Sequence, residues 1–356
     1  MQAFYNLDYG LLLLPRLAQV LSYSAQKLLA LVLLTLACNA GASPLFEDDT
    51  VLRIDLTGPL SSLVDNKKNR VELPFVLRAD DVGHLVNVRV RGKSRIRVCD
   101  FPPLRVIFSK NGAEQTVFEG QNKLKLVTHC GNGSGAQANI LKEYAAYKIF
   151  NLISDIGYKV RLVHISYTDT DEPTKKAFDS YGYFIESASE LADRVGGEPV
   201  DVPAVLLSSF DKQHLASVFV FEYLIGNTDW SLVTNEADDS CCHNGDLFDI
   251  GSSRYYVPYD FDLSGLVNTR YARPDPSLHI SSVTIRRYRG YCISAEALLN
   301  AIRAIAGEKN DILGVVTRMR GLPGKDIEKA TRFLEKFFEQ ADKADKLARS
   351  FERRCL

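Results

Sequence analysis

A series of short apolar segments between residues 50 and 128 constrains the fold of this chain most. Apolar residues there alternate with polar residues, or cluster, between Gly, Asn and Asp breaks, which is typical of β-strands. The segments are TVLRIDL, VELPFVLRA, LVNVRVRG, PLRVIFSK, QTVFEG and KLKLVTH. The pattern therefore predicts a β-rich region at the start of the folded protein.

Helical patterns become dominant further along the chain. Residues 138–157 place apolar side chains on one broad face, and Gly157 closes this predicted helix. Two more strands follow, YKVRLVHISYTD and SYGYFIES. From residue 188 the pattern favours helices, among them 188–195, 211–226 and a long amphipathic tail that starts at Asp326.

This order of elements predicts the fold class. Strands first and helices later are typical of an α+β protein. We expect two lobes, a β-rich N-terminal lobe with one helix at 43–187 and a mainly helical C-terminal lobe at 188–356. The acidic site considered below belongs to the second lobe.

The N-terminal segment has the pattern of an export signal. Lys27 precedes the apolar stretch 28–37, and Ala40 and Ala42 follow in an A-x-A arrangement. We therefore predict that residues 1–42 are removed and that the protein resides in the periplasm or cell envelope. A buried helix of the mature fold is the alternative, because apolar runs of this length are common in core helices.

Cysteine usage agrees with export. Beyond residue 42 the chain has an even number of cysteines, which are Cys99, Cys130, Cys241, Cys242, Cys292 and Cys355. In an oxidising compartment these residues could form disulfides, although spacing does not give the connectivity. Cys241 and Cys242 could bond to each other or to separate partners. The chain has no C-x-x-C pair, which argues against a zinc ribbon.

Two other functional classes find little support. The net charge of −1 argues against nucleic-acid binding. The segment GNGSGA, residues 131–136, fits the G-x-G-x-x-A dinucleotide fingerprint between a strand and a helix. However, the expected acidic residue about 20 positions later comes only at Asp169 or Asp171, so a flexible loop is favoured.

Acidic and amide side chains gather in the second half of the chain. Asp229 lies in the loop after the predicted helix 211–226, Asn244 on a returning strand or loop, and Asp260 and Asp262 at the end of its hairpin partner, in PYDFDLSG after the strand RYYVPY. Such oxygens hold Mg²⁺, and kinases use an aspartate near the acceptor hydroxyl with an asparagine and an aspartate on the metal. Turn-capping roles are the alternative, and spacing alone leaves both interpretations open.

Several segments between about residues 85 and 270 match the motifs of one family in order. They are VRVRGKSRIRVCDFPPLRVIF, LKLVTH with the following ILKEYAAYKIF helix, SYGYFIES, IGNTDWS, HN and PYDFDLSG. The chain thereby resembles the CotH-type (spore-coat protein) kinases and, more distantly, the HipA-type and phosphoinositide-type atypical kinases. The resemblance implies a two-lobed atypical kinase-like fold that uses ATP with Mg²⁺ or Mn²⁺.

The resemblance also assigns roles to individual residues. It makes Asp229 the catalytic aspartate, and it makes Asn244 and Asp260 metal ligands, with Asp262 assisting. Glu143 takes the place of the helix glutamate that positions a phosphate-binding cation.

The phosphate-binding cation departs from the family pattern. Pro102 and Pro103 stand where the family has lysines, so Arg105 becomes the first candidate, with Lys93 or Lys125 behind it. Arginine holds phosphate through its planar fork of donors.

These observations lead to two functional hypotheses. The first is a metal- and nucleotide-dependent phosphotransferase of the cell envelope, whose acceptor, a protein hydroxyl being one option, the sequence does not identify. The second is a catalytically inactive kinase-like binding or scaffold protein, because ATP is scarce in a periplasm and the usual lysine is missing. Neither hypothesis involves nucleic acid, and contact with a membrane is expected only through the export signal.

Overall fold

The computed structural model describes residues 43–131, 133–233 and 240–356, and the predicted export signal lies outside them. The first elements are α2 (Pro44–Glu47), β1 (Leu52–Gly58), α3 (Leu60–Asp65), β2 (Leu73–Ala79), β3 (Val82–Val90), α4 (Arg95–Val98), β4 (Leu104–Phe108), β5 (Lys123–Val127), α5 (Ser134–Ile153), β6 (Val160–Asp169) and β7 (Phe178–Ile185). They are followed by α6 (Ala188–Val195), β8 (Glu198–Val200), η1 (Leu207–Ser209), α7 (Lys212–Ile225), β9 (Gly245–Ile250), β10 (Ser253–Pro258), η2 (Pro276–Leu278), α8 (Ala295–Gly307), α9 (Lys309–Thr317), α10 (Gly324–Ala341) and α11 (Ala344–Glu352).

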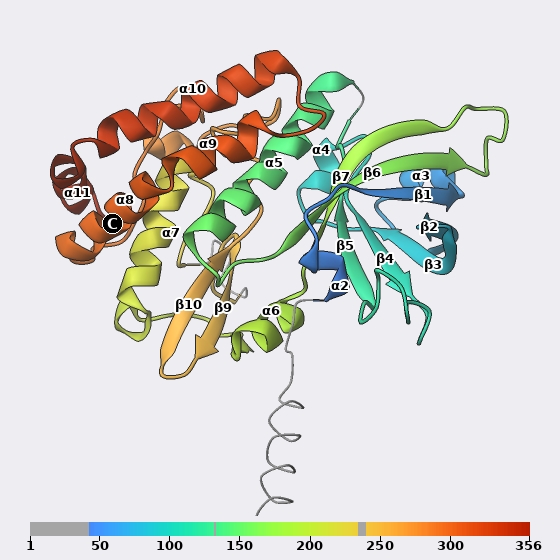
Figure 1. Ribbon diagram of the computed structural model, residues 1–356, viewed down its shortest axis with the longest axis horizontal. Coiled ribbons are helices and arrows are strands. Elements are labelled where there is room, and N and C mark those ends of the chain that lie inside the picture. The colour runs from blue at the N-terminus through green and yellow to red at the C-terminus, as the bar shows by residue number, and fades with distance from the viewer. Residues whose placement is uncertain (1–42, 132, 234–239) are drawn as a thin grey trace, which may run out of the picture. The chain divides into compact units, whose positions relative to one another are not determined.

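Seven strands, β1 to β7, close into a barrel in the order β1-β2-β3-β4-β5-β7-β6 (Figure 1). Neighbouring strands are antiparallel except β1 and β6, whose parallel pairing closes the barrel. In β1 the side chains of Leu52, Ile54 and Leu56 are buried, whereas Arg53 and Asp55 are exposed. This alternation fills the barrel interior with apolar side chains.

The predicted division into a β-rich lobe and a mainly helical lobe of the kinase type is wrong. The strands form a closed barrel, and the second half of the chain carries a further three-stranded sheet, β10-β9-β8. A strand pattern shows where strands lie but not which edges pair, so it could not predict the parallel closure of β1 on β6. Two local predictions also differ from the structure, because residues 115–120 form turns and the C-terminal helix is interrupted at Asp342–Lys343 between α10 and α11.

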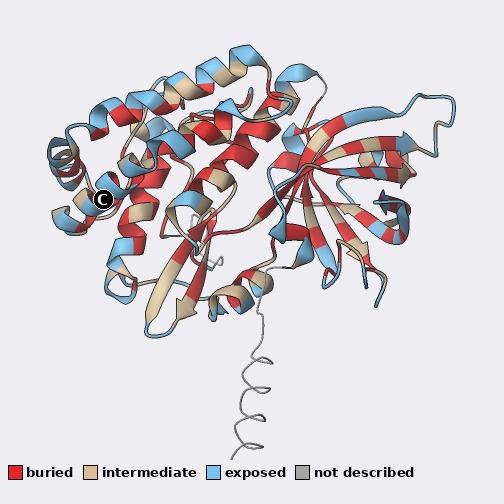
Figure 2. Cartoon of the chain, viewed as in Figure 1, coloured by how far each residue is buried: buried red, intermediate tan, exposed pale blue. Residues whose placement is uncertain are grey.

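Helix α5 connects the barrel to the helices. It contacts β6 and β7 on one side and α7 and α9 on the other. It begins at Ser134 and ends at Ile153, earlier at both ends than the predicted 138–157. Figure 2 shows buried residues along much of α5 and α7. As a result the carboxylate of Glu143, in the middle of α5, lies in the interior.

The end of α7 places the loop that carries Asp229. Asp211 accepts a hydrogen bond from the His214 N–H at the start of this helix, and Gly226 ends it with a left-handed φ of 66°. A Cβ on Gly226 would come within 2.8 Å of Phe333. The N–H of Gly265 donates to the Gly226 carbonyl at 3.0 Å, which holds the loop after α7 beside the loop after β10.

Candidate functional site around Arg95

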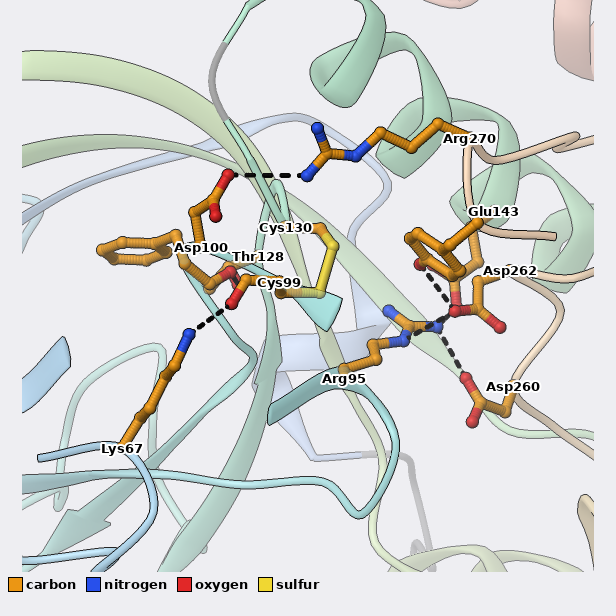
Figure 3. The surroundings of a disulfide bond; sticks show 12 residues. Lys67, Arg95, Cys99, Asp100, Thr128, Cys130, Glu143, Asp260, Asp262 and Arg270 are labelled. Atoms are coloured by element: carbon orange, nitrogen blue, oxygen red, sulfur yellow. Dashed lines mark hydrogen bonds and ion pairs between the residues drawn. A yellow bond between two sulfur atoms is a disulfide. The ribbon is translucent and has the colours of Figure 1, made fainter. Parts of the chain in front are cut away.

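The guanidinium group of Arg95, the first residue of α4, lies among three carboxylates (Figure 3). Its Nη2 atom lies 2.5 Å from Glu143 Oε1 and 2.6 Å from Asp260 Oδ1, and its Nε atom lies 3.0 Å from Asp262 Oδ2. The Arg95 side chain is 7% exposed. A buried guanidinium group therefore offsets the repulsion between the two aspartates of the DFD segment.

We define the Arg95 cluster as Arg95, Glu143, Asp260 and Asp262. Two tyrosines form hydrogen bonds with its two aspartates. The hydroxyl of Tyr147 on α5 accepts a hydrogen bond from the Asp260 N–H at 3.0 Å. Asp260 has a left-handed φ of 62°, so the chain turns sharply at this point. The Tyr271 hydroxyl donates to Asp262 Oδ2 at 2.7 Å, which satisfies a buried carboxylate oxygen.

Burial dominates the electrostatics of the cluster. It raises the pKa of Asp262 to about 8, although Arg95 acts in the opposite direction. Burial also raises the pKa of Glu143, again against the effect of Arg95. For Arg95 burial alone would lower the pKa, but the three carboxylates raise it well above its ordinary value. The guanidinium group therefore stays charged, and the two most buried acids hold their protons more firmly than in water.

A second group of side chains surrounds Asp229. His243 Nε2 lies 3.0 Å from Asp229 Oδ1, and the Asn244 amide Nδ2 donates to Asp229 Oδ2 at 2.8 Å. We call these three residues the Asp229 cluster. About a third of the Asp229 and His243 side chains is exposed. The hydrogen bond to Asp229 raises the pKa of His243, which also lies near the charge of Asp260.

The two clusters adjoin through the backbone. The N–H of Tyr259 donates to the Asn244 carbonyl at 3.0 Å, so Asn244 lies next to the residue that precedes Asp260. The sequence prediction that Asp229, Asn244, Asp260 and Asp262 gather in one place agrees with these contacts.

Cationic side chains line a small cavity beside Asp260. This cavity has a volume of about 80 Å³, and Arg91, Lys93, Arg95 and Glu143 are among its walls. Burial lowers the pKa of Arg91, whereas the nearby carboxylate of Asp260 raises it. Arg91, which is partly buried, and Lys93, which is exposed, place cations beside this cavity, and cations of this kind form strong hydrogen bonds with phosphate groups.

The other two cation candidates from the sequence lie on neighbouring barrel strands. In the strand register Arg105 on β4 pairs with Arg89 on β3 and with Lys125 on β5. Burial and then Arg91 lower the pKa of Lys125, whose Nζ lies 5.6 Å from the centre of the Tyr158 ring. Arg105 is not among the residues that line the cavity, while Lys93 is.

The sequence analysis missed Arg95 and His243. Arg95 belongs to the RGKSRIR segment, whose repeated cations are a visible signal, but the family pattern directed attention to the strand that follows. His243 directly precedes Asn244, and its contact with Asp229 depends on the isolated bridge between Ser231 and His243.

The predicted metal ligands fit a cation unequally. Among the described residues, no group of three or more His, Cys, Asp or Glu side chains is arranged to hold a metal ion. Asp262 is a poor ligand, because Arg95 and Tyr271 both contact its Oδ2 and burial favours its protonated form. Asn244 and Asp260 lie on segments joined by the hydrogen bond from the Tyr259 N–H to the Asn244 carbonyl, and the amide oxygen and carboxylate of such residues are of the kinds that Mg²⁺ accepts.

Three pairs of cysteines lie at disulfide distance, which is compatible with the predicted disulfides and gives the pairing that the spacing left open. They are Cys99–Cys130, Cys241–Cys242 and Cys292–Cys355. The first pair joins the end of α4 to the segment between β5 and α5, close to the Arg95 cluster (Figure 3). Cys241 and Cys242 immediately precede the histidine and the asparagine of the Asp229 cluster.

Comparisons with known proteins add no assignment to this geometry. The sequence matches no protein-family model, and no curated protein is significantly similar to it. Within residues 43–131, 133–233 and 240–356, no helix combines the length and the apolar character needed to cross a membrane.

Proposed function

We propose that the two clusters form the active site of a metal- and nucleotide-dependent phosphotransferase of the cell envelope. The observation that carries the proposal is the position of Arg95, which bonds at once to Glu143 on α5 and to Asp260, beside the Asp229 cluster. This arrangement places a fixed cation and the Asp260 carboxylate in the wall of the small cavity, next to the segment that holds Asn244 and, through it, Asp229. Phosphoryl transfer requires these elements for charge stabilisation and for orientation of the acceptor.

Each residue of the site has a proposed role. Arg91 and Lys93 attract the phosphates of ATP from the wall of the small cavity, and Arg95 fixes the position of Asp260. Asn244 and Asp260 would hold Mg²⁺ or Mn²⁺, and a bound cation would offset the negative charge of the phosphates.

Asp229 is the proposed base. Its carboxylate accepts the proton of the acceptor hydroxyl while the hydroxyl oxygen bonds to the transferred phosphorus and the bond to the leaving nucleotide oxygen breaks. His243 and Asn244 hold the two carboxylate oxygens of Asp229 and thereby fix its orientation. The acceptor is a hydroxyl compound, with a protein hydroxyl as one option.

Export and family membership are parts of the same proposal. The three cysteine pairs support an oxidising compartment, which the A-x-A motif before residue 43 also predicts. The resemblance to the CotH-type kinases supports the assigned chemistry through its motifs alone, because the barrel departs from the fold that the resemblance implied.

A thermal-shift titration with ATP and Mg²⁺ or Mn²⁺ tests the proposal. A ligand at ~100 times its dissociation constant stabilises the folded state by about 2.7 kcal/mol, which such a titration detects. We expect a metal-dependent shift that Asp260→Asn removes. Asp345→Asn is the matched control, because Asp345 is 59% exposed and pairs with Arg303 on another helix. A shift that Asp260→Asn leaves unchanged would refute the metal role of Asp260.

One observation favours a non-catalytic binding module as a second candidate. Arg95 already offsets the charges of Asp260 and Asp262, so the cluster is stable without a bound cation. If neither ATP nor another nucleotide shifts the melting temperature with either metal, while the protein remains folded, this second candidate takes precedence. A search for macromolecular partners would then follow.

A further inference from the structure

A second, larger cavity touches the Arg95 cluster. It has a volume of about 430 Å³ and shares Arg95 and Glu143 with the small cavity. Its other walls come from the segment 129–131, from the first half of α5, from the segment 268–271 and from the start of α10. The volume lies in the range of about 300–1,000 Å³ that is usual for small-molecule sites.

Two buried polar side chains in the wall of this cavity have no hydrogen-bond partner among the described residues. Thr269 is 5% exposed, and its hydroxyl oxygen is unpaired. His129 is 4% exposed, and its Nδ1 atom is unpaired. Native structures rarely leave such groups unsatisfied, so unpaired polar atoms around a cavity indicate a ligand. Burial lowers the pKa of His129 to about 4, so its ring is neutral at pH 7 and can donate one hydrogen bond.

The start of α5 supplies further donors. Gly133 at the N-cap position has no side chain to cap the helix, and its φ is 99°. The first N–H groups of a helix have no partner within the helix and attract anions. The Ala136 N–H donates to the Gly133 carbonyl at 3.1 Å, which leaves the N–H groups of Ser134 and Gly135 as the donors without a partner in the helix, and Gly135 lines the cavity. The GNGSGA segment, which the sequence pattern assigned to a flexible loop, therefore contributes residues to a cavity wall.

The charges around the cavity favour an anion. The lining includes four cationic residues, Arg95, Lys142, Arg270 and Lys329, against two acids, Glu143 and Asp326. Arg95 already neutralises much of the charge of Glu143. Arg270 is 70% exposed and lies 3.5 Å from Asp100, so this loose pair leaves its guanidinium group available to a ligand (Figure 3).

We propose that this cavity binds a small molecule that carries a phosphate group. Thr269 and His129 donate to the phosphate oxygens together with the first N–H groups of α5, and Arg270 closes over the charge from the solvent side. A phosphate group accepts hydrogen bonds on three oxygens, which matches this number of convergent donors better than a carboxylate does. The cavity meets the small cavity at Arg95 and Glu143, but Thr269, His129 and Arg270 line only the larger one, so the inference does not depend on the proposed function.

Thermal-shift titrations of the full chain with inorganic phosphate and, separately, with AMP test this site. Potassium chloride holds the ionic strength constant, so screening does not contribute to the shift. We expect both probes to stabilise the protein, with Arg270→Gln weakening the apparent affinity about tenfold, as for the loss of one charged hydrogen bond. Thr269→Val should weaken it severalfold while leaving the unliganded protein folded, because it replaces an unpaired hydroxyl with a methyl group of similar size.

Control variants make the result specific. Arg303→Gln removes a cation that is 59% exposed and ion-paired, on α8, and should leave the affinity unchanged. The proposal is overturned if neither probe shifts the melting temperature up to about 10 mM, ten times a millimolar dissociation constant. It is also overturned if Arg91→Gln removes the thermal shift while Arg270→Gln and Thr269→Val keep it. The anion would then bind in the small cavity beside Asp260. Neither result depends on whether ATP and a metal ion bind in the small cavity beside Asp260.

Discussion

The Arg95 cluster and the Asp229 cluster adjoin each other but differ in burial and charge balance. In the first, one guanidinium group with 7% exposure serves three carboxylates. In the second, one carboxylate with 36% exposure is held by an imidazole and an amide. Ionic contacts in the first cluster therefore act in a low dielectric, whereas those in the second act partly in water.

Because of this difference, we assign a structural role to the Arg95 cluster and a chemical role to the Asp229 cluster. A buried network that loses one member leaves uncompensated charges, so the Arg95 cluster contributes mainly to the stability of the fold. The Asp229 carboxylate, which is about one-third exposed, can contact a substrate and exchange a proton, so the Asp229 cluster is suited to the reaction. The position of Asp260 in the first cluster connects the two roles.

The largest expected effect is the loss of Arg95. Arg95→Gln leaves three carboxylates without their cation, and we expect it to lower the free energy of unfolding by about 3–5 kcal/mol, measured by urea denaturation. Arg254→Gln is the matched control, because Arg254 pairs with Asp249, which is 45% exposed, and should cost only about 1 kcal/mol. Similar losses in the two variants would mean that the ion pairs of the Arg95 cluster contribute no more than an exposed pair, contrary to their burial.

The next effect concerns turnover. Asp229→Asn keeps the size of the side chain but removes the base, and we expect nucleotide turnover to fall at least about a hundredfold. ATP hydrolysis with Mg²⁺ or Mn²⁺ measures this loss, and urea denaturation should show a change in stability of less than about 1 kcal/mol. If the variant loses stability but keeps turnover, Asp229 has a structural role, and the assignment of the reaction to the Asp229 cluster is wrong.

Local patterns in the sequence predicted local features well. The alternation in TVLRIDL predicted β1, and the apolar periodicity with Gly226 predicted α7 within one residue at each end. The order of Asp229, Asn244 and Asp260 along turns and a hairpin predicted that they would gather, because β9 and β10 form that hairpin. These features depend on contacts that are close in sequence.

Long-range pairing could not be predicted in the same way. The ion pair between Arg95 and Asp260 joins residues 165 positions apart, and the parallel pairing of β1 with β6 joins Leu52 to Val163. A guanidinium group can pair with any acid in the chain, so its partner depends on the complete fold. For the same reason the pattern directed attention to Arg105 and did not identify Arg95.

A moderate effect is expected at Tyr271. Tyr271→Phe removes the hydroxyl that donates to Asp262, and we expect a loss of about 1–2 kcal/mol at pH 7, measured by urea denaturation. Burial holds the pKa of Asp262 at about 8 and the hydroxyl lowers it, so the variant should raise this pKa further and cost more at pH 9, where the carboxylate ionises, than at pH 7, where it is mostly protonated. A cost that is larger at pH 7 than at pH 9 would contradict a stabilising contact with the ionised carboxylate.

The smallest expected effect is a pH dependence that arises in the Asp229 cluster. The hydrogen bond to Asp229 raises the pKa of His243 in the folded protein above its unfolded value of about 6.5. This contribution to stability is fully present below pH ~6.5 and is lost as the pH rises through the folded pKa. Because the pair is about one-third exposed, the contribution should be below about 1 kcal/mol. Urea midpoints between pH 5.5 and 8.5 for the wild type and for His243→Gln measure it as the part of the pH dependence that the variant lacks. Identical pH profiles would mean that His243 is neutral beside Asp229, and the contact would then orient the carboxylate without adding charge to the site.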